Sequence, residues 1–384
     1  MKILRFIIGC LTGCLAAGVL FPPALTLSAP VQGVLARPAI KVRDPSKCGC
    51  VLIDVAFAGD RLVAVGERGI VLYSDDRGDT WEQAQVPVGV TLTAVFFSNS
   101  RMGWAVGHGG VVLHTTDSGK TWQLQLEGVA AAQMALESAR GRAQRAVPED
   151  TKAKQMLSNA ILLMEDGPDK PFLDLFFKND REGFIIGSYG LIFRTEDGGT
   201  TWSCIMDRVE NPGGMHLFTI HATDGVIYIV GEKGLFLVSG DGGDSFRQIK
   251  TPYSSTFFDI QALPSGDIVL VGLRGSACWS ADQGQTFSKS NVMLNAVVEI
   301  SFADAVMLPD GRLLFANQAG MLQESRDRGR TIIPVQTPQP GSISSILPMG
   351  DNLIMTVGTG GAVRVRLPSS GLPEKMRTDK GGRP

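Results

Sequence analysis

Ionisable and aromatic side chains recur in a repeated sequence motif, V-G-x-x-G and its close variants. Across the chain, the two variable positions hold carboxylates, cations, a histidine, a tyrosine and a glutamine. These residues are Glu67, Arg68, His108, Tyr189, Glu232, Lys233, Arg274 and Gln318. Two close carboxylates can hydrolyse a glycosidic bond, whereas cations can hold an anionic partner. The motif therefore raises two hypotheses, glycoside chemistry and protein binding.

A second motif, S/T-x-D-x-G-x-T/S-aromatic, returns at intervals of about 40 residues, with one interval of about 80. Its aspartates are Asp76, Asp117, Asp197, Asp241, Asp282 and Asp327, and its tryptophans are Trp81, Trp122 and Trp202. Asp, Ser and Thr side chains accept hydrogen bonds from nearby backbone and so close turns. The motif is the Asp-box, found on hairpins of sialidase-like and related propellers. We interpret its aspartates as turn formers and not as catalytic groups.

Seven units of short apolar strands surround these motifs, and the repeat period is typical of propeller blades. In each unit V-G-x-x-G ends the second strand, and the Asp-box joins the third strand to the fourth. We therefore predict an all-β, seven-bladed β-propeller with Asp-box hairpins. In such a blade the second-to-third turn lies on the opposite face from the Asp-box. The eight residues at the variable V-G-x-x-G positions should then form one surface, the channel-mouth ring.

The seventh unit, residues 343–367, has no Asp-box and no evident fourth strand. Residues 34–42 precede the first unit and are strand-like apart from Pro38, which an outermost strand tolerates. We expect this N-terminal strand to complete the last blade and to close the ring.

The long interval between Asp117 and Asp197 predicts an insertion at residues 128–170, between blades 2 and 3. Its strong helix formers and helical apolar spacing indicate a helical hairpin. The hairpin is either a clip packed on the adjacent blade or an element that docks a partner.

The termini suggest an exported protein. Residues 1–36 hold a basic start and an apolar run, which predicts a signal peptide or an N-terminal anchor, cleaved, lipidated or retained. The propeller then occupies 37–367, and the tail 368–384 is expected to be disordered. This predicts a periplasmic or exported location. Net charge is −2 with no concentrated basic face, which argues against nucleic-acid binding.

The four cysteines of the exported part do not indicate a metal site, because the histidines form no ligand-spaced cluster with them. Export permits disulfides, and the pairing is left open. Cys48 and Cys50 are expected to be too close in sequence to bond easily to each other. Cys204 and Cys278 are expected to be buried in strands.

An enzymatic function is disfavoured. Glu67 and Glu232 belong to blades 1 and 4 and should face each other across a wide channel. The arginine motif typical of sialidases is missing before the first Asp-box. We predict no catalytic residue, no cofactor and no metal. A sialidase-like glycosidase or glycan-binding protein remains the alternative, and a structural module of an envelope assembly is a third hypothesis.

Several runs resemble the photosystem II assembly and stability factor family, especially its relatives in non-photosynthetic bacteria. They are GERG at 66–69, GWAVGH at 103–108, RTEDGGTTW at 194–202 and GLRG at 272–275. The resemblance implies a non-enzymatic propeller that binds a membrane protein complex or its assembly intermediate, with Arg68 and Arg274 as contact residues. It also suggests a transporter of the resistance-nodulation-division type as partner. We expect the chain to be a monomer.

Overall fold

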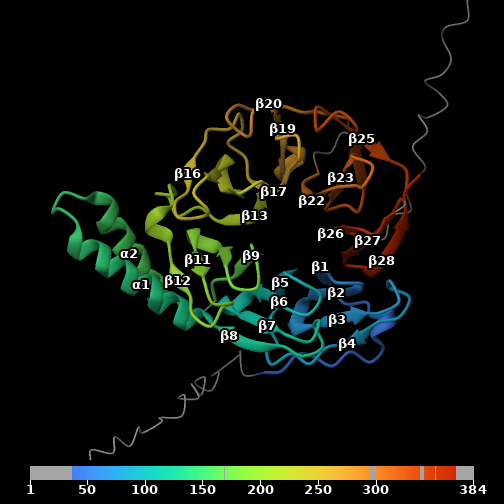
Figure 1. Cartoon of the computed structure of the whole chain (residues 1–384), viewed down its shortest axis with the longest axis horizontal. Helices are drawn as coiled ribbons and strands as arrows, with labels where there is room; N and C mark the ends of the chain where they lie inside the picture. The colour runs from blue at the N-terminus through green and yellow to red at the C-terminus, as the bar shows by residue number, and fades with distance from the viewer. Residues whose placement is uncertain (1–36, 168, 294–299, 338–340, 351, 369–384) are drawn as a thin grey trace, which may run out of the picture.

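Seven mainly antiparallel sheets stand in a ring around one axis (Figure 1). The computed structural model describes residues 37–167, 169–293, 300–337, 341–350 and 352–368. The predicted signal segment 1–36 and nearly all of the predicted disordered tail lie outside this range. The ring confirms the all-β prediction for the described residues.

Within each sheet the strands follow chain order from the axis outward, apart from one added strand at the edge of sheet 6. Sheet 1 has β1 (Leu52–Ala58), β2 (Arg61–Gly66), β3 (Val71–Ser74) and β4 (Glu82–Gln83). Sheet 2 has β5 (Leu92–Phe97), β6 (Gly103–Gly107), β7 (Val112–Thr115) and β8 (Gln123–Leu126). Sheet 3 has β9 (Phe172–Phe177), β10 (Gly183–Gly187), β11 (Ile192–Thr195) and β12 (Ser203–Cys204). Sheet 4 has β13 (Leu217–Thr223), β14 (Val226–Gly231), β15 (Phe236–Ser239) and β16 (Arg247–Gln248).

Sheet 5 keeps the four-stranded pattern, whereas sheets 6 and 7 depart from it. Sheet 5 has β17 (Phe257–Ala262), β18 (Ile268–Gly272), β19 (Ala277–Ser280) and β20 (Ser288–Lys289). Sheet 6 has β22 (Phe302–Met307), β23 (Leu313–Asn317), β24 (Leu322–Ser325) and β25 (Thr331–Val335), with β21 (Asn291–Val292) parallel to β25 at its edge. Sheet 7 has three strands, β26 (Ile343–Pro348), β27 (Leu353–Gly358) and β28 (Gly361–Arg366).

Side chains on the innermost strands bridge every pair of adjacent sheets. We call these seven residues the junction side chains: Asp54, Thr93, Asp174, Thr219, Asp259, Asp304 and Ser345. Four bonds join a carboxylate to the backbone of the next sheet: Asp54 to Val95 N (2.8 Å), Asp174 to Ile220 N (2.8 Å), Asp259 to Ala305 N (2.7 Å) and Asp304 to Ile346 N (2.6 Å). Three bonds are donated by hydroxyls: Thr93 to Phe172 O (2.8 Å), Thr219 to Phe258 O (2.7 Å) and Ser345 to Asp54 (3.0 Å). The last bond connects sheet 7 to sheet 1 and completes the circle.

The six aspartates of the second repeated motif organise the turns between third and fourth strands. Asp76 is typical: it accepts hydrogen bonds from the Ser74 hydroxyl (2.8 Å), the Thr80 hydroxyl (2.6 Å) and the Thr80 N–H (2.9 Å). The Ser74 hydroxyl also accepts from Gly78 N (2.7 Å). Asp117, Asp197, Asp241, Asp282 and Asp327 each accept the matching hydroxyl and N–H bonds. The aromatic residues that follow, Trp81, Trp122 and Trp202, are buried.

Each of these turns also packs on the sheet before it, because its glycine leaves no room for a side chain. A Cβ on Gly243 would lie 2.2 Å from the Phe184 ring, and one on Gly329 would lie 2.3 Å from Val269. A Cβ on Gly78, in sheet 1, would lie 2.5 Å from Met355 in sheet 7. The turns therefore fix the spacing between neighbouring sheets around the ring.

The seam between sheets 7 and 1 closes without the predicted N-terminal strand. Within the described residues nothing pairs with the outer edge of β28, and residues 37–42 form no strand. These residues lie along sheet 1, where Ala39 N donates to Val86 O (3.4 Å) and Ile40 N donates to Arg68 O (3.1 Å). The prediction that residues 34–42 complete the last blade is therefore wrong for this described part. Sheet 1 supplies free backbone acceptors and an apolar edge to the segment.

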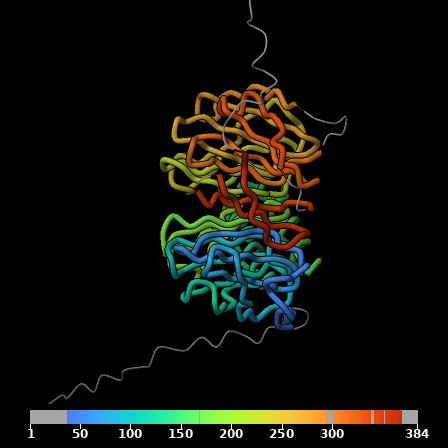
Figure 2. Tube along the Cα trace, turned by 90° about the vertical axis from the view of Figure 1, so that its right-hand side faces the viewer, coloured from blue at the N-terminus to red at the C-terminus, as the bar shows by residue number. Residues whose placement is uncertain are grey.

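Apolar and polar contacts hold the seam together, and the edge-on view shows the last sheet beside the first (Figure 2). Cys50, Leu52 and Trp81 share one buried cluster with Met355 and Val357. Across the same seam, Arg77 donates to Met349 O (2.6 Å), and Arg364 pairs with Asp79. Side-chain packing thus replaces the missing ladder hydrogen bonds.

The predicted helical hairpin lies between sheets 2 and 3 and projects beside β12 at the rim (Figure 1). Helix α1 (Gly128–Arg145) begins where the Glu127 carboxylate accepts from Val129 N and Ala130 N. Helix α2 (Thr151–Asp166) begins at Asp150, whose carboxylate accepts from Ala153 N. Neither helix of the described chain is long and apolar enough to cross a membrane.

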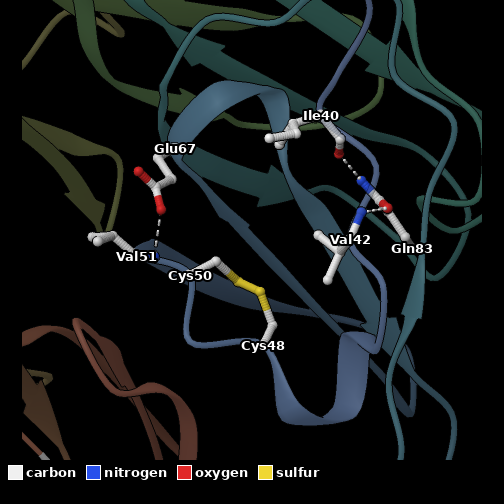
Figure 3. The surroundings of a disulfide bond; sticks show 7 residues. All are labelled: Ile40, Val42, Cys48, Cys50, Val51, Glu67 and Gln83. Carbon is white, nitrogen blue, oxygen red and sulfur yellow. Dashed lines mark hydrogen bonds between the residues drawn. A yellow bond between two sulfur atoms is a disulfide. The ribbon is translucent and has the colours of Figure 1, made fainter.

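Cys48 and Cys50 form a disulfide, contrary to the expectation that their closeness disfavours a bond (Figure 3). The prediction overlooked that the chain bends at Gly49, which brings the two Cα atoms to 5.1 Å and the two sulfurs together. By the chain-entropy estimate, closing so short a loop stabilises the fold by about 1.6 kcal/mol, roughly half the value for a 15-residue loop. Cys204 and Cys278 are free; Cys278 is fully buried and Cys204 is half-buried.

Burial perturbs the junction carboxyls strongly. It raises the pKa of Asp54 to about 6 and that of Asp174 to about 8, and it raises the pKa of Asp259 and Asp304 as well. In the turns, hydrogen bonds from Thr80 and Thr286 lower the pKa of Asp76 and Asp282 to about 2. The protonated junction groups stabilise the fold fully below the ordinary carboxyl pKa of 3.8, and this stabilisation is lost as pH rises through 6 and 8.

We therefore predict that the free energy of unfolding falls as pH rises from 5 to 8, by roughly 1.4 kcal/mol per pH unit for each proton that only the native state retains. The Asp174→Asn variant, which is neutral at every pH, should have a shallower slope between pH 6 and 8 in denaturant titrations. Asp224→Asn, an exposed turn residue, is the matched control and should keep the wild-type slope. An unchanged slope in Asp174→Asn would contradict the assignment.

Candidate functional site

The V-G-x-x-G motifs form tight turns at one end of the sheets. Five are short 3-10 turns: η3 (Glu67–Gly69), η4 (His108–Gly110), η5 (Ser188–Gly190), η7 (Glu232–Gly234) and η8 (Leu273–Gly275). All join second to third strands, so they leave the antiparallel sheets on the same face. The aspartate turns join third to fourth strands and lie on the opposite face.

Close backbone contacts explain both glycines of the motif. A Cβ on the first glycine would collide with the chain entering the same sheet: Gly187 would meet Pro171 O at 2.4 Å, and Gly66 would meet Val51 O at 2.2 Å. The last glycine has a left-handed backbone, with φ 74° at Gly69, where a Cβ would lie 2.0 Å from Val88 O. The motif is thus fixed by packing, and only the two middle positions are free to vary.

The sixth turn replaces the first glycine by Asn317, which is buried. Its side-chain oxygen accepts from Ala319 N and Met321 N, both at 3.0 Å. The amide therefore closes the turn with side-chain hydrogen bonds, and Gln318 still projects into solvent.

The two carboxylates of the channel-mouth ring are held by backbone. Glu67 accepts from Val51 N (3.1 Å), and Glu232 accepts from His216 N (3.0 Å). Their turns belong to sheets 1 and 4, on opposite sides of the ring (Figure 1). The ring therefore does not bring them together as a hydrolytic pair.

The cations of the ring are unpaired. Arg68, Lys233 and Arg274 are exposed, and each has a left-handed backbone with φ between 53° and 56° that points it away from its sheet. Within the described residues their side chains have no hydrogen bond or ion pair. His108 and Gln318 are also exposed at their turns. This face thus presents free donors and positive charge to solvent.

Tyr189 connects the channel-mouth ring to the inserted helical hairpin. The residue is 52% exposed, and its backbone N–H donates to His216 Nδ1 (2.8 Å). The Tyr189 and His216 rings meet edge to face at 5.0 Å, and Lys170 Nζ lies 5.4 Å from the centre of the Tyr189 ring. The tyrosine is therefore held at the point where the ring meets the inserted hairpin.

A cavity of about 860 Å³ separates the helical hairpin from the link between sheets 3 and 4. Ala139, Met156 and Leu162 line it from the helices, and Tyr189 and Met206 line it from the propeller side. Its volume lies in the range of small-molecule and cofactor pockets. A pocket of this size was not evident in the sequence, because its walls come from segments far apart in the chain.

Arg142 lies at the end of this cavity. Its guanidinium is 3.7 Å from the Asp150 carboxylate and donates to Asp207 O at 3.5 Å, while its Nε is buried without a partner. Glu210, on the same wall, is occupied by Gln248 N (2.8 Å). The cavity thus combines apolar side chains with a guanidinium, that of Arg142, whose Nε has no hydrogen-bond partner.

Sequence reasoning missed the junction carboxyls Asp54, Asp174, Asp259 and Asp304. A signal was present, because each lies two residues after the first residue of an innermost strand. They serve the ring itself. No group of three or more His, Cys, Asp or Glu side chains in the described chain is placed to bind a metal ion.

Comparison with known proteins identifies the family. The family model described as "Photosynthesis system II assembly factor YCF48" matches residues 41–137 and 158–253. The chain belongs to this family. The stretch between the two matches, 138–157, spans the end of α1 and the start of α2, so most of the hairpin tip is not part of the YCF48 family pattern. No curated protein sequence matches the chain.

Solved structures agree on the fold. A structure described as "YCF48 bound to D1 peptide" is 17% identical, with a TM-score of 0.59 over 86% of this chain and 99% of that chain. YCF48 from Cyanidioschyzon merolae is 18% identical, with a TM-score of 0.58 over 87% and 99%. The WD40 β-propeller domain of Doa1 is 11% identical, with a TM-score of 0.57 over 86% and 95%. The chain is therefore a β-propeller, as predicted.

The close contact at the first motif glycine yields a stability test. Gly187→Ala should lower the free energy of unfolding by roughly 2 kcal/mol or more, because the new methyl must displace Pro171 O. Gly240→Ala is the control, since a Cβ there meets nothing within 4 Å and should change stability by less than about 0.5 kcal/mol. Equal stabilities of the two variants in thermal or denaturant unfolding would refute the packing explanation.

Proposed function

We propose that this chain is a non-enzymatic, exported, seven-bladed propeller that binds a membrane protein complex or its assembly intermediate. The channel-mouth ring and the cavity beside the hairpin are the contact surfaces. A transporter of the resistance-nodulation-division type is the partner class that we would test first. We further propose that the chain acts in the periplasm, free or held by its N-terminus, as a monomer.

The distribution of charge on one face carries the proposal. Arg68, Lys233 and Arg274 project without partners, whereas Glu67 and Glu232 are occupied by backbone N–H groups. The ring therefore carries three positive and two negative charges, a net charge of +1, although the whole chain has a net charge of −2; its cations are free to bind, whereas its carboxylates are already hydrogen-bonded. Such a face suits acidic or carboxylate-bearing segments of a partner, since Arg and Lys make strong charge-assisted hydrogen bonds with carboxylates.

The cavity adds an apolar component to this surface. Tyr189 belongs to both features, so a bound segment can extend from the cationic ring into the cavity. Leu162 is 52% exposed at the cavity edge, and exposed apolar groups beside a hollow are typical of docking sites. This combination supports recognition of a peptide-like segment with apolar and acidic side chains.

Family membership points in the same direction. The family model is that of an assembly factor, and one similar structure is of YCF48 with a D1 peptide bound. We extend peptide binding to this chain as part of the proposal. The glycosidase alternative gains no support from the site, because the ring carboxylates belong to opposite sheets and each already accepts a backbone N–H.

Charge reversal tests the ring. The double variant Arg68→Glu with Arg274→Glu should lose capture of the partner, because two attractive contacts become repulsive. The assay is photo-crosslinking from position 233 in the native envelope, with the captured protein identified by mass spectrometry. Thermal unfolding should be unchanged, since neither side chain has a partner in the described residues.

The matched control reverses two exposed cations away from the ring. Lys120 lies in an aspartate turn on the opposite face, and Arg247 lies on the outer strand β16. Lys120→Glu with Arg247→Glu should keep wild-type capture. Capture retained by the ring variant, or lost equally by both double variants, would count against the ring.

A neighbouring pair of leucine and isoleucine tests the cavity. Leu162→Glu places a charge at the cavity edge and should weaken partner binding by about tenfold or more, as expected for loss of about 1.4 kcal/mol or more. Ile161→Glu is the control, because Ile161 is 39% exposed on the same helix but does not line the cavity. Equal binding by the two variants, measured with the partner identified by crosslinking, would exclude the cavity from the interface.

A further inference from the structure

The Cys48–Cys50 disulfide lies where the N-terminal segment enters the ring (Figure 3). Cys50 is buried beside Leu52 and Met355, whereas Cys48 is only half-buried. Gly49, between them, is exposed, and nothing lies within 4 Å of the position a Cβ would take. One end of the bond is thus anchored in the core, and the other lies at an open turn.

A bond that closes so short a loop stabilises the fold by about half as much as one that closes a 15-residue loop, because it removes less freedom from the unfolded chain. The strand that follows is already fixed, since Val51 N donates to Glu67 Oε1 at 3.1 Å. Accessible disulfides with little structural role are the ones that exchange readily with other thiols. The position therefore indicates a function other than stability.

One cation lies next to the pair in the sequence. Lys47 precedes Cys48 directly, and its side chain is 84% exposed. Its ammonium lies 3.7 Å from the Asp44 carboxylate, which offsets part of its charge. An ammonium that approaches a cysteine stabilises its thiolate, which is the form that reacts with disulfides.

The pair is joined to the channel-mouth ring through two short paths, both visible in part in Figure 3. On one side, Val51 follows Cys50 and holds the Glu67 carboxylate. On the other, the segment before Cys48 is tied to sheet 1: Gln83 bonds to Val42 N (2.8 Å) and to Ile40 O (2.6 Å). Ile40 N in turn donates to Arg68 O (3.1 Å), so this segment also touches the ring turn.

We propose that Cys48–Cys50 is a thiol–disulfide exchange site, which reacts with a protein dithiol and thereby changes how firmly the Glu67–Arg68 turn is held. This rests on the proposed function only in taking that turn as part of the partner-binding surface. The reaction itself is independent of any partner.

The exchange proceeds in two steps that balance. A thiolate of the dithiol attacks the more accessible Cys48 sulfur, the Cys48–Cys50 bond breaks, and Cys50 leaves and takes up a proton. The second thiolate of the dithiol then attacks the first dithiol sulfur, which is bonded to Cys48 in the mixed disulfide. This step releases Cys48 as a thiolate, which takes up a proton. Two electrons pass from the dithiol to the cysteine pair, and the dithiol becomes a disulfide.

The chemical test uses the full chain under native conditions. The protein is equilibrated in glutathione buffers of stepped thiol-to-disulfide ratio and then in excess dithiothreitol, followed by alkylation and peptide mass spectrometry. The Cys48–Cys50 peptide should change from unmodified to doubly alkylated within the glutathione series. A pair that stays oxidised even in excess dithiothreitol would overturn the proposal.

The coupling test measures amide hydrogen exchange in the oxidised and reduced forms. Reduction should speed exchange by about tenfold or more at Val51 and across residues 38–47, because local opening then costs less. The matched segment is the η7 turn at Glu232–Gly234, which has the same motif without a cysteine pair and should not change. Equal exchange in both forms at Val51 would show that the pair is not coupled to the ring.

A double variant without the disulfide is the control for the coupling test. Cys48→Ser with Cys50→Ser should show the same amide hydrogen exchange at Val51 as the reduced wild type in both redox conditions.

Partner crosslinking separates the two proposals. Crosslinking from position 233 is compared between oxidised and reduced wild type. If the redox change at Val51 is seen but no partner is captured in either form, the proposed function fails and the exchange site stands; if a partner is captured equally in both forms, regulation of the ring fails and the proposed function stands.

Discussion

The hydrogen bonds between innermost strands are the constraint on which the rest of the structure depends. Each sheet offers the next one a short polar side chain, carboxylate or hydroxyl; six of these reach a backbone group across the junction, and the seventh, Ser345, reaches the Asp54 carboxylate. The last of these bonds, from Ser345 to Asp54, returns to the first sheet and makes the ring continuous. Buried polar groups must be satisfied, so each bridge fixes both the distance and the register of its two sheets.

The junction side chains and the aspartate turns fix the sheets. The side chains on the face of the channel-mouth ring are therefore not needed to hold the sheets together. The glycines of V-G-x-x-G meet backbone and cannot vary without collision, but the residues between them meet solvent. This explains how a rigid ring can hold Arg68 and Arg274 in strained left-handed turns and still leave their side chains unpaired. The same logic accounts for the hairpin: an insertion in a link between sheets adds a wall, and with it a cavity, without disturbing the bridges.

The repeated motifs allowed the strands, both kinds of turn and the hairpin to be predicted, because each depends on local chemistry that recurs at fixed spacing. Three features escaped prediction because they depend on contacts between distant segments. Residues 37–42 found a better edge on sheet 1 than on β28. The junction carboxyls looked like misplaced charges in apolar strands, and the cavity has one wall from the inserted helices and another from the link between sheets 3 and 4. The Cys48–Cys50 disulfide escaped prediction for a local reason, the bend of the chain at Gly49.

The seam between sheets 7 and 1 differs from the other junctions in how its outside is covered. Every other junction is covered on its outside by a fourth strand, whereas sheet 7 ends at β28 within the described residues. The seam is therefore closed by side chains: a shared apolar cluster, the Arg77 and Arg364 contacts, and the carbonyl of Cys48, which lies 2.7 Å from where a Cβ on Gly361 would stand. A closure made by packing responds to small shifts of the entering chain more readily than one made by a ladder of backbone bonds. That places the cysteine pair, the N-terminal segment 37–47 and the Glu67–Arg68 turn at the part of the ring where a local change has the shortest path to the binding face.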